Sequence, residues 1–156
     1  MSFNKISNTL SAKIKAQNIA KVRGSSNFKY DALSITSRLE VKDAVDFAKN
    51  QSKKSRIEYA IIKGQSLLDL QKDGNLNKVD QLFNWIEKNK APMMLIIDDI
   101  DIVLESNANG DFIQEILSIF EQKKSKVILV LCGKNTSPEI SKLMDQHIEI
   151  TSNMLS

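Results

Sequence analysis

The sequence predicts an α/β protein in which a parallel sheet is covered by helices on both faces. Two runs, residues 93–97 and 127–131, contain only apolar residues and lack the alternation of a half-exposed strand. Such runs are typical of strands that are buried on both faces of a parallel sheet. Around them, segments of strand composition alternate with segments whose apolar residues recur at helical spacing, which favours a parallel α/β architecture.

The expected elements follow from apolar spacing and from turn residues. The expected strands are residues 28–36, 58–63, 93–97, 127–131 and 147–150. The expected helices are residues 39–49, 76–88, 111–122 and 138–144. A polar turn is expected at residues 50–55, and Gly64 is expected to end the second strand.

Length and composition limit the classes of protein that the chain can belong to. A chain of 156 residues with 42% apolar content can bury one core, and its length predicts a single folded domain. The single cysteine, Cys132, excludes an internal disulfide and a metal site made of several cysteines. The single histidine, His147, leaves little material for histidine-based catalysis or for a zinc site. The longest apolar runs fall far short of the about 20 residues that span a bilayer.

Positive charge is concentrated in the first thirty residues, which hold six basic residues and no acidic one. The rest of the chain holds the other 16 basic residues against all 19 acidic ones, a net charge of −3, so we expect no direct contact with nucleic acid. The first segment is also amphipathic, because Phe3, Ile6, Leu10 and Ile14 would share a helical face. We therefore divide the chain into a basic N-terminal arm, residues 1–27, and an α/β domain, residues 28–156.

A basic, acid-free, amphipathic N-terminus has the composition of a mitochondrial targeting segment. The alternative interpretation is a basic tail, or a surface helix that docks on an acidic partner. A targeting segment that is retained and then packs on a neighbouring protein would satisfy both interpretations. We expect a mitochondrial protein whose membrane contact is made only through partner proteins or through the arm.

Two of the expected strands carry motifs of a known family. Residues 95–97 are hydrophobic, and the acidic pair Asp98 and Asp99 follows them, then Ile100 and Asp101. This order resembles the Walker B motif of AAA+ ATPases, in which a buried strand delivers one carboxylate to Mg²⁺ and a second carboxylate polarises the attacking water. Residues 127–131 and the polar turn after them resemble the strand that carries the sensor-1 residue of these enzymes.

The order of these elements from residue 58 to residue 149 is similar to that of the mitochondrial ATPase-family AAA-domain-containing protein three type. The resemblance extends less specifically over residues 28–150. It implies a three-layer, P-loop-NTPase-like AAA+ core with a parallel sheet. Because the chain stops soon after the last strand, we expect no C-terminal helical lid.

The phosphate-binding loop of this family does not match the sequence. Such a loop needs glycines that let backbone N–H groups approach the phosphates, and a lysine that reaches the β- and γ-phosphates. No glycine lies between Gly24 and Gly64. An ungapped placement puts the loop on residues 34–41, a stretch that includes Ser37 and Arg38 and ends with Glu40 at the lysine position and Val41 at the metal-binding hydroxyl position.

Three further family positions differ. Asp99 stands where the family uses glutamate, so its carboxylate is about one methylene short of the attacking water. Lys134 or Asn135 occupies the place of the sensor-1 asparagine, and Gln146 stands where the arginine finger is expected. We therefore expect no catalytic residue, no cofactor and no bound metal.

The sequence thus predicts a non-catalytic accessory subunit of a large mitochondrial protein complex. We favour a respiratory-chain or ATP synthase assembly, on the matrix side of the inner membrane, with other protein subunits as partners. One alternative is a weak nucleotide-binding sensor or a residual ATPase that uses Asp98 and Asp99. Another is a mitoribosome-associated protein or a cytosolic adaptor.

Overall fold

The computed structural model describes residues 32–72, 93–106, 111–123, 127–135 and 144–150, together with residues 80, 81, 84, 88 and 142. The basic arm and most of the helices expected at residues 76–88 and 138–144 lie outside the described residues. The described part contains a five-stranded sheet in the order β2-β3-β4-β1-β5, and every neighbouring pair of strands is parallel. The predicted parallel α/β sheet is confirmed.

The strands fall close to their expected positions. They are β1 (Ala32–Ser37), β2 (Glu58–Lys63), β3 (Met93–Asp98), β4 (Val127–Gly133) and β5 (Gln146–Ile150). Within the described residues β1 begins at Ala32, and the expected residues 28–31 lie outside them. The six residues of β1 and the seven of β4 are all buried, which explains why β4 reads as an unbroken apolar run.

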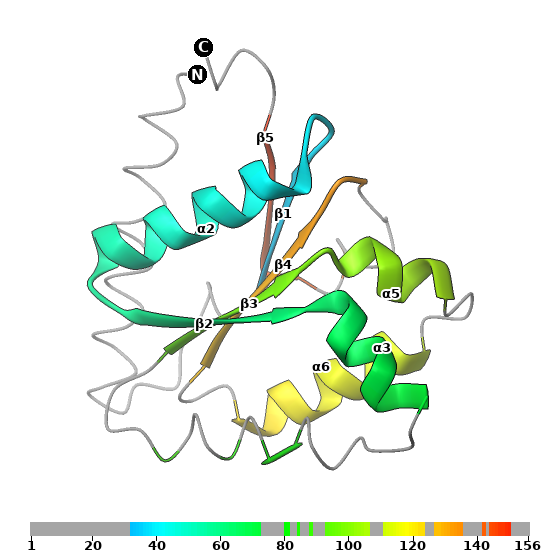
Figure 1. Ribbon diagram of the computed structural model, residues 1–156. Helices are drawn as coiled ribbons and strands as arrows, with labels where there is room; N and C mark the ends of the chain where they lie inside the picture. The colour runs from blue at the N-terminus through cyan, green and yellow to red at the C-terminus, as the bar shows by residue number, and fades with distance from the viewer. Residues whose placement is uncertain are drawn as a thin grey trace.

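Helices cover both faces of the sheet and complete three layers (Figure 1). Helix α2 (Val41–Ser55) packs on one face, where Phe47 lies in a core with strand residues such as Leu33, Ile96 and Val130. Helices α3 (Gly64–Lys72), α5 (Ile100–Ser106) and α6 (Asp111–Lys123) lie on the other face. Their core residues are Leu67, Leu68, Ile100, Val103, Ile116 and Phe120, which pack against alternate residues of β3 and β4.

Helix α2 continues through residues 50–55, so the prediction of a polar turn at these residues is wrong. Gln51, Ser52 and Ser55 are polar, but all three are buried and extend the stripe that Ala44 and Ala48 begin. The helix ends only at its C-cap, Arg56, whose backbone is left-handed at a φ of 57° and donates its N–H to the carbonyl of Lys53. The last part of this helix was not predicted because its residues are polar.

Two helices were not expected from the sequence, α3 and α5. Helix α3 begins at Gly64, a residue that was predicted only to end the second strand. A Cβ at Gly64 would collide with the backbone carbonyl of Asp99 and would lie 2.9 Å from Cγ2 of Ile102. The glycine therefore lets the β2–α3 junction approach the turn between β3 and α5, which brings both segments to one edge of the sheet.

Candidate functional site

The candidate site lies at the edge of the sheet that is formed by the C-terminal ends of the parallel strands. In the register of the sheet, Lys63 of β2 is the partner of Asp98 of β3, and Thr36 of β1 is the partner of Gly133 of β4. The residues that follow these strands come to the same edge, which is the usual position of ligand sites in open α/β sheets. The structure thus brings together three of the predicted segments: the β1–α2 loop, the acidic pair and the turn after β4.

The loop between β1 and α2 is short. Ser37 is the last residue of β1 and is buried, and Val41 is the first residue of α2, so only residues 38–40 connect them. Glu40 is the N-cap residue in an extended conformation (φ −148°, ψ 140°), and its carbonyl accepts the backbone N–H of Asp43 at 3.1 Å.

Acidic side chains stand at the N-terminus of α2. Asp43 lies in the first turn and accepts a hydrogen bond from the Ser37 hydroxyl at 3.5 Å. Glu40 precedes it with an exposed side chain. A helix N-terminus attracts anions through its free N–H groups and its dipole, and here side chains of the chain itself supply the negative charge.

The basic residue of the loop is directed towards β5. The Arg38 Nε atom lies 3.1 Å from Oε1 of Glu149, and the two side chains are 80% and 40% exposed. An exposed pair of this kind contributes about 0–1 kcal/mol to stability. Leu39, the middle residue of the loop, is 50% exposed.

Asp98 points to the side of the sheet that α2 covers. Side chains alternate along a strand, and Asp98 follows Met94 and Ile96, which belong to the core on that side. Burial raises the pKa of the neighbouring Cys132 thiol far above its usual range, and the charge of Asp98 raises this pKa further. Asp98 is therefore placed on the face where a Walker B carboxylate would meet a ligand at the N-terminus of α2.

Asp99 occupies the turn between β3 and α5. Its backbone is left-handed at a φ of 62°, a conformation that aspartate tolerates better than most residues. Burial raises the pKa of the Asp99 carboxyl, the charges of Asp101 and Asp98 raise it further, and a hydrogen bond from the backbone of Ile102 opposes the rise. That bond comes from the third residue of α5, so Asp99 acts as the helix cap.

Asp101 joins the acidic segment to the turn after β4. Its Oδ2 atom accepts the backbone N–H of Lys134 at 2.6 Å and that of Asn135 at 3.4 Å. The approach depends on Gly133, because a Cβ there would lie 2.8 Å from Oδ1 of Asp101 and 3.0 Å from Cγ2 of Ile100. Asp101 was part of the predicted motif, but its contact with the turn after β4 was not predicted. The available signal was the glycine at the end of a buried strand.

Gln146 lies at the opposite end of the sheet from these residues. It is the first residue of β5 and the register partner of Leu33, near the start of β1. Within one chain it therefore does not face the edge at which Asp98 lies. The next residue, His147, is half-buried on the edge strand, and its Nδ1 atom lies 2.6 Å from the Ser34 hydroxyl. Burial lowers the pKa of His147, and Glu149 opposes this shift.

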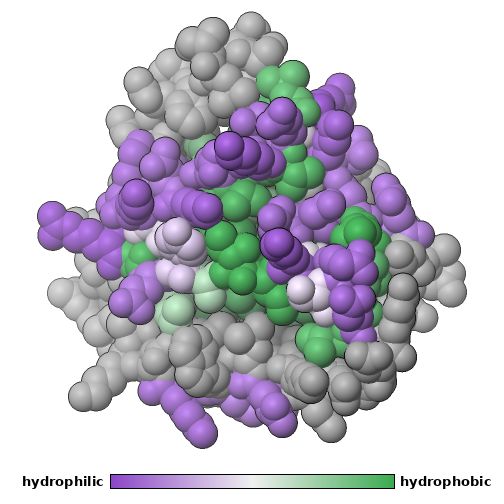
Figure 2. Space-filling model, viewed as in Figure 1, coloured by the Kyte–Doolittle hydropathy of each residue, from purple (hydrophilic) through white to green (hydrophobic). Residues whose placement is uncertain are grey.

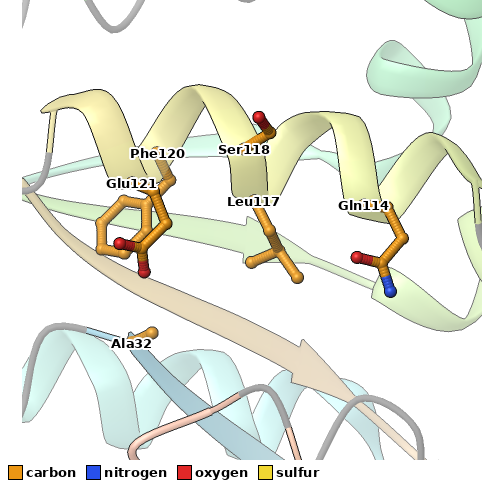
Figure 3. A pocket seen from close by; sticks show the side chains of 6 residues that line it. All are labelled: Ala32, Gln114, Leu117, Ser118, Phe120 and Glu121. Atoms are coloured by element: carbon orange, nitrogen blue, oxygen red, sulfur yellow. The ribbon is translucent and has the colours of Figure 1, made fainter.

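A cavity of about 220 Å³ lies away from the candidate site, between α6 and the start of β1 (Figure 3). The side chains of Gln114 and Leu117 hang from α6 on the side of the helix that faces β1, and Ala32 of β1 lines the cavity from below. Among the described residues, no group of three or more potential ligands could hold a metal ion. In the same part of the chain, no helix has the length and apolar character needed to cross a bilayer.

Comparison with known proteins identifies the family. Residues 45–152 match the model of the ATPase family associated with various cellular activities (AAA). The structure is similar to that of PCH-2 from C. elegans, with a TM-score of 0.63 at 11% sequence identity, over 94% of this chain and 43% of PCH-2. The chain thus spans less than half of the length of that protein. No curated protein sequence matches the chain.

The chain belongs to the AAA family, and its sheet and helices form the α/β core of that fold. The region matched by the family model begins at Val45, inside α2. The β1–α2 loop and the predicted phosphate-loop residues precede that region.

Proposed function

We propose that this AAA domain is a non-catalytic accessory subunit of a large mitochondrial protein complex. The observation that carries the proposal is the β1–α2 loop, which has three residues and no glycine. A phosphate loop encloses the phosphates with backbone N–H groups, and this requires both length and close approach of bare backbone. A three-residue connection with Leu39 at its centre offers neither.

Charge at the loop supports the same conclusion. Glu40 and Asp43 place two carboxylates at the N-terminus of α2, where the family's lysine and phosphates would meet. Arg38, the one cation of the loop, lies against Glu149 on the far side of β1. A triphosphate would therefore encounter repulsion where a phosphate loop provides attraction.

The acidic residues have structural roles that need no nucleotide. Asp99 caps α5, and Asp101 holds the backbone N–H groups of Lys134 and Asn135. These contacts stabilise the edge of the sheet in the free chain. A fold that is kept without its chemistry serves through its surface, and we assign that surface to contacts with other subunits.

The mitochondrial part of the proposal rests on the basic, acid-free composition of the first thirty residues. A fusion of these residues to a fluorescent reporter is expected to enter mitochondria. A diffuse cytosolic signal would favour the adaptor alternative. We place the protein on the matrix side of the inner membrane, in a respiratory-chain or ATP synthase assembly, with a mitoribosome-associated position as the alternative.

The host is tested with tagged protein expressed at its natural level. Mild detergent extraction and native electrophoresis are expected to show the tag in a band of several hundred kilodaltons, together with inner-membrane complex subunits. Recovery only as the free chain of 17.6 kDa, or as its self-associated form, would contradict the proposal.

The second candidate function is a residual ATPase, which the position of Asp98 favours. Asp98 lies at the end of a buried strand on the face covered by α2, as a magnesium-binding carboxylate would. Phosphate release from Mg-ATP by purified protein distinguishes the two functions. Turnover that Asp98→Asn abolishes would support the ATPase, and turnover indistinguishable from buffer supports the accessory subunit.

A further inference from the structure

The five parallel strands begin at the edge of the sheet that lies opposite the candidate site, which we call the N-terminal edge. Helix α2 follows the end of β1 and is joined to the start of β2 by two residues, so its last turn lies at the N-terminal edge. In Figure 1 this edge is seen at the left and lower left, where α2 ends and where β2, β3 and β4 begin.

Positive charge is concentrated in the sequence directly before the strands. The five residues before β1, β2, β3, β4 and β5 hold one, three, two, three and one basic residues, against two acidic residues, Asp31 and Asp145. Some of these residues lie outside the described part of the chain, and the strand that each precedes assigns it to the N-terminal edge. The five residues after each strand hold three basic and three acidic residues in total, so the opposite edge has no such excess.

Five of the ten basic residues have described side chains, and all five are exposed. They are Lys53, Lys54, Arg56, Lys88 and Lys142. Figure 2 shows hydrophilic residues at the left of the molecule, where α2 ends. A helix C-terminus attracts cations, but its partial charge of about −0.5 is much smaller than the three positive charges at the end of α2.

Arg56 is a cation in a backbone conformation that favours glycine. It is the C-cap of α2, with a φ of 57° and a ψ of 42°, where a Cβ atom costs stability. Its side chain is exposed and does not belong to the core, so packing does not explain the arginine. A strained residue that is kept in this way points to a use for its side chain.

We propose that the N-terminal edge of the sheet contacts an anionic bilayer surface, with its basic side chains among the lipid phosphates. Clusters of four to eight basic residues on an amphipathic helix are typical of binding to anionic lipids, and each strengthens binding about fivefold. Five strand starts spaced about 4.8 Å apart spread these charges over about 19 Å, and so broad a row suits a flat surface better than a pocket.

The basic arm favours a bilayer over a nucleic acid as the partner. Residues 1–27 precede β1, so the arm joins the sheet at the N-terminal edge. Its predicted apolar face, which includes Phe3 and Leu10, suits the boundary between headgroups and acyl chains, whereas a phosphate backbone offers it no partner. Two weak attachments at one edge give stable binding that neither gives alone. The contact is additional to those expected through partner proteins and through the arm.

The proposal is tested by sedimentation of the full chain with vesicles of phosphatidylcholine that contain about one third phosphatidylglycerol. The edge variant carries Lys53→Gln, Lys54→Gln and Lys88→Gln. The control variant removes three exposed lysines from the end of the sheet that holds the candidate site, through Lys42→Gln, Lys63→Gln and Lys134→Gln. Both variants lose the same net charge, and circular dichroism checks that both are folded.

The unmodified chain is expected to bind these vesicles, to release them as salt is raised to about 0.5 M, and to leave vesicles of phosphatidylcholine alone unbound. The edge variant should bind about a hundredfold more weakly, and the control variant should stay within about threefold of the unmodified chain. Equal losses in the two variants would mean that net charge, and not this edge, attracts the bilayer. No binding by the unmodified chain would refute the proposal.

Two further outcomes would assign the charge to another use and so overturn the proposal. In the first, the edge variant binds as the unmodified chain does, and an arm variant with Lys5→Gln, Lys13→Gln and Lys15→Gln does not, so the arm alone makes the contact. In the second, the unmodified chain binds polyuridylate RNA more tightly than vesicles at the same salt concentration, so the partner is a nucleic acid.

Arg56→Gly separates the charge from the backbone. Glycine suits the left-handed conformation, so the midpoint of thermal unfolding should rise by a few degrees while vesicle binding weakens about fivefold. Unchanged binding in this variant would remove Arg56 from the surface and contradict its assignment. The inference extends the proposed inner-membrane location, but the purified chain is tested without its host complex. Failure of vesicle binding therefore leaves the host assignment standing, and the reverse also holds.

Discussion

Replacement of Gly133 by alanine tests the contact that joins the two motifs. Where alanine can adopt the native backbone conformation without strain, a glycine-to-alanine substitution stabilises a protein by about 0.4–1 kcal/mol, because alanine restricts the unfolded chain. At Gly133 the new Cβ would lie 2.8 Å from Oδ1 of Asp101, well inside the about 3.5 Å of an ordinary van der Waals contact. The carboxylate must therefore move, and its hydrogen bond with the Lys134 N–H weakens.

The magnitude follows from these opposing effects. Overpacking at a buried position costs about 1–3 kcal/mol, and the gain from the unfolded state offsets part of that cost. We expect Gly133→Ala to lower the free energy of unfolding by about 1–2 kcal/mol. Urea titrations followed by far-UV circular dichroism resolve a change of this size, provided that the m-value is unchanged.

A double-mutant cycle shows whether Asp101 is the cause. Asp101→Ala alone is expected to cost about 1 kcal/mol, because it removes a partly exposed, charge-assisted bond. In the double variant the colliding atom is absent, so the loss should be smaller than the sum of the two single losses by about 1 kcal/mol. Additivity within about 0.5 kcal/mol, or a more stable Gly133→Ala variant, would show that the Asp101 carboxylate does not limit the space at Gly133.

Further predictions concern the same edge of the sheet and β5. Gly64→Ala should lower the free energy of unfolding by about 3 kcal/mol, more than Gly133→Ala, because the new Cβ would collide with the backbone of Asp99. Thermal unfolding of both variants measures the two losses, and a larger loss for Gly133→Ala would contradict the prediction. Asp99→Asn should raise the free energy of unfolding at pH 7. Because the pKa of Asp99 is raised in the folded chain, the protonated carboxyl stabilises the fold and is lost as pH rises through that pKa, whereas asparagine stays neutral and also tolerates the left-handed backbone. The gain in stability from Asp99→Asn should therefore shrink towards pH 4. A lower free energy of unfolding for the variant at pH 7 would contradict this prediction. The pKa of His147 is lowered in the folded chain, so the unfolded chain binds the proton first and the free energy of unfolding should fall as pH drops below about 6.5. His147→Gln should flatten this part of the plot of stability against pH. An unchanged slope in the variant would show that His147 is not the group responsible.

The central strands could be predicted from the sequence because burial on both faces leaves a clear signal. Residues 93–97 and 127–131 are unbroken apolar runs, and both lie in strands with buried centres. Helix α6 was also predicted almost to its ends, because its apolar residues repeat at helical spacing.

The end of α2 and the start of α3 could not be predicted from the sequence. Gln51, Ser52 and Ser55 look like a surface turn, but the end of α2 buries them against the sheet. Helix α3 was missed because it begins with a glycine, and a glycine signals a break unless the close approach of another segment is known.

Some features of the candidate site could likewise be predicted from the sequence, and others could not. The positions of Asp98 and Asp99 at the end of β3 follow from the motif alone. The hydrogen bonds between Asp101 and the turn at Lys134 join residues that are 33 positions apart, and they require the strand order, which apolar spacing does not contain. The exposure of Tyr59 and Ile61 likewise depends on β2 being the edge strand.

The turn between β1 and α2 is not expected to hold a nucleotide, and calorimetric titration of the purified chain with Mg-ATP measures this. We predict no saturable heat up to millimolar ligand, because Glu40 and Asp43 stand where the phosphates would lie and residues 38–40 are too few to enclose them. Saturable binding of one nucleotide per chain, lost in Asp98→Ala, would contradict it.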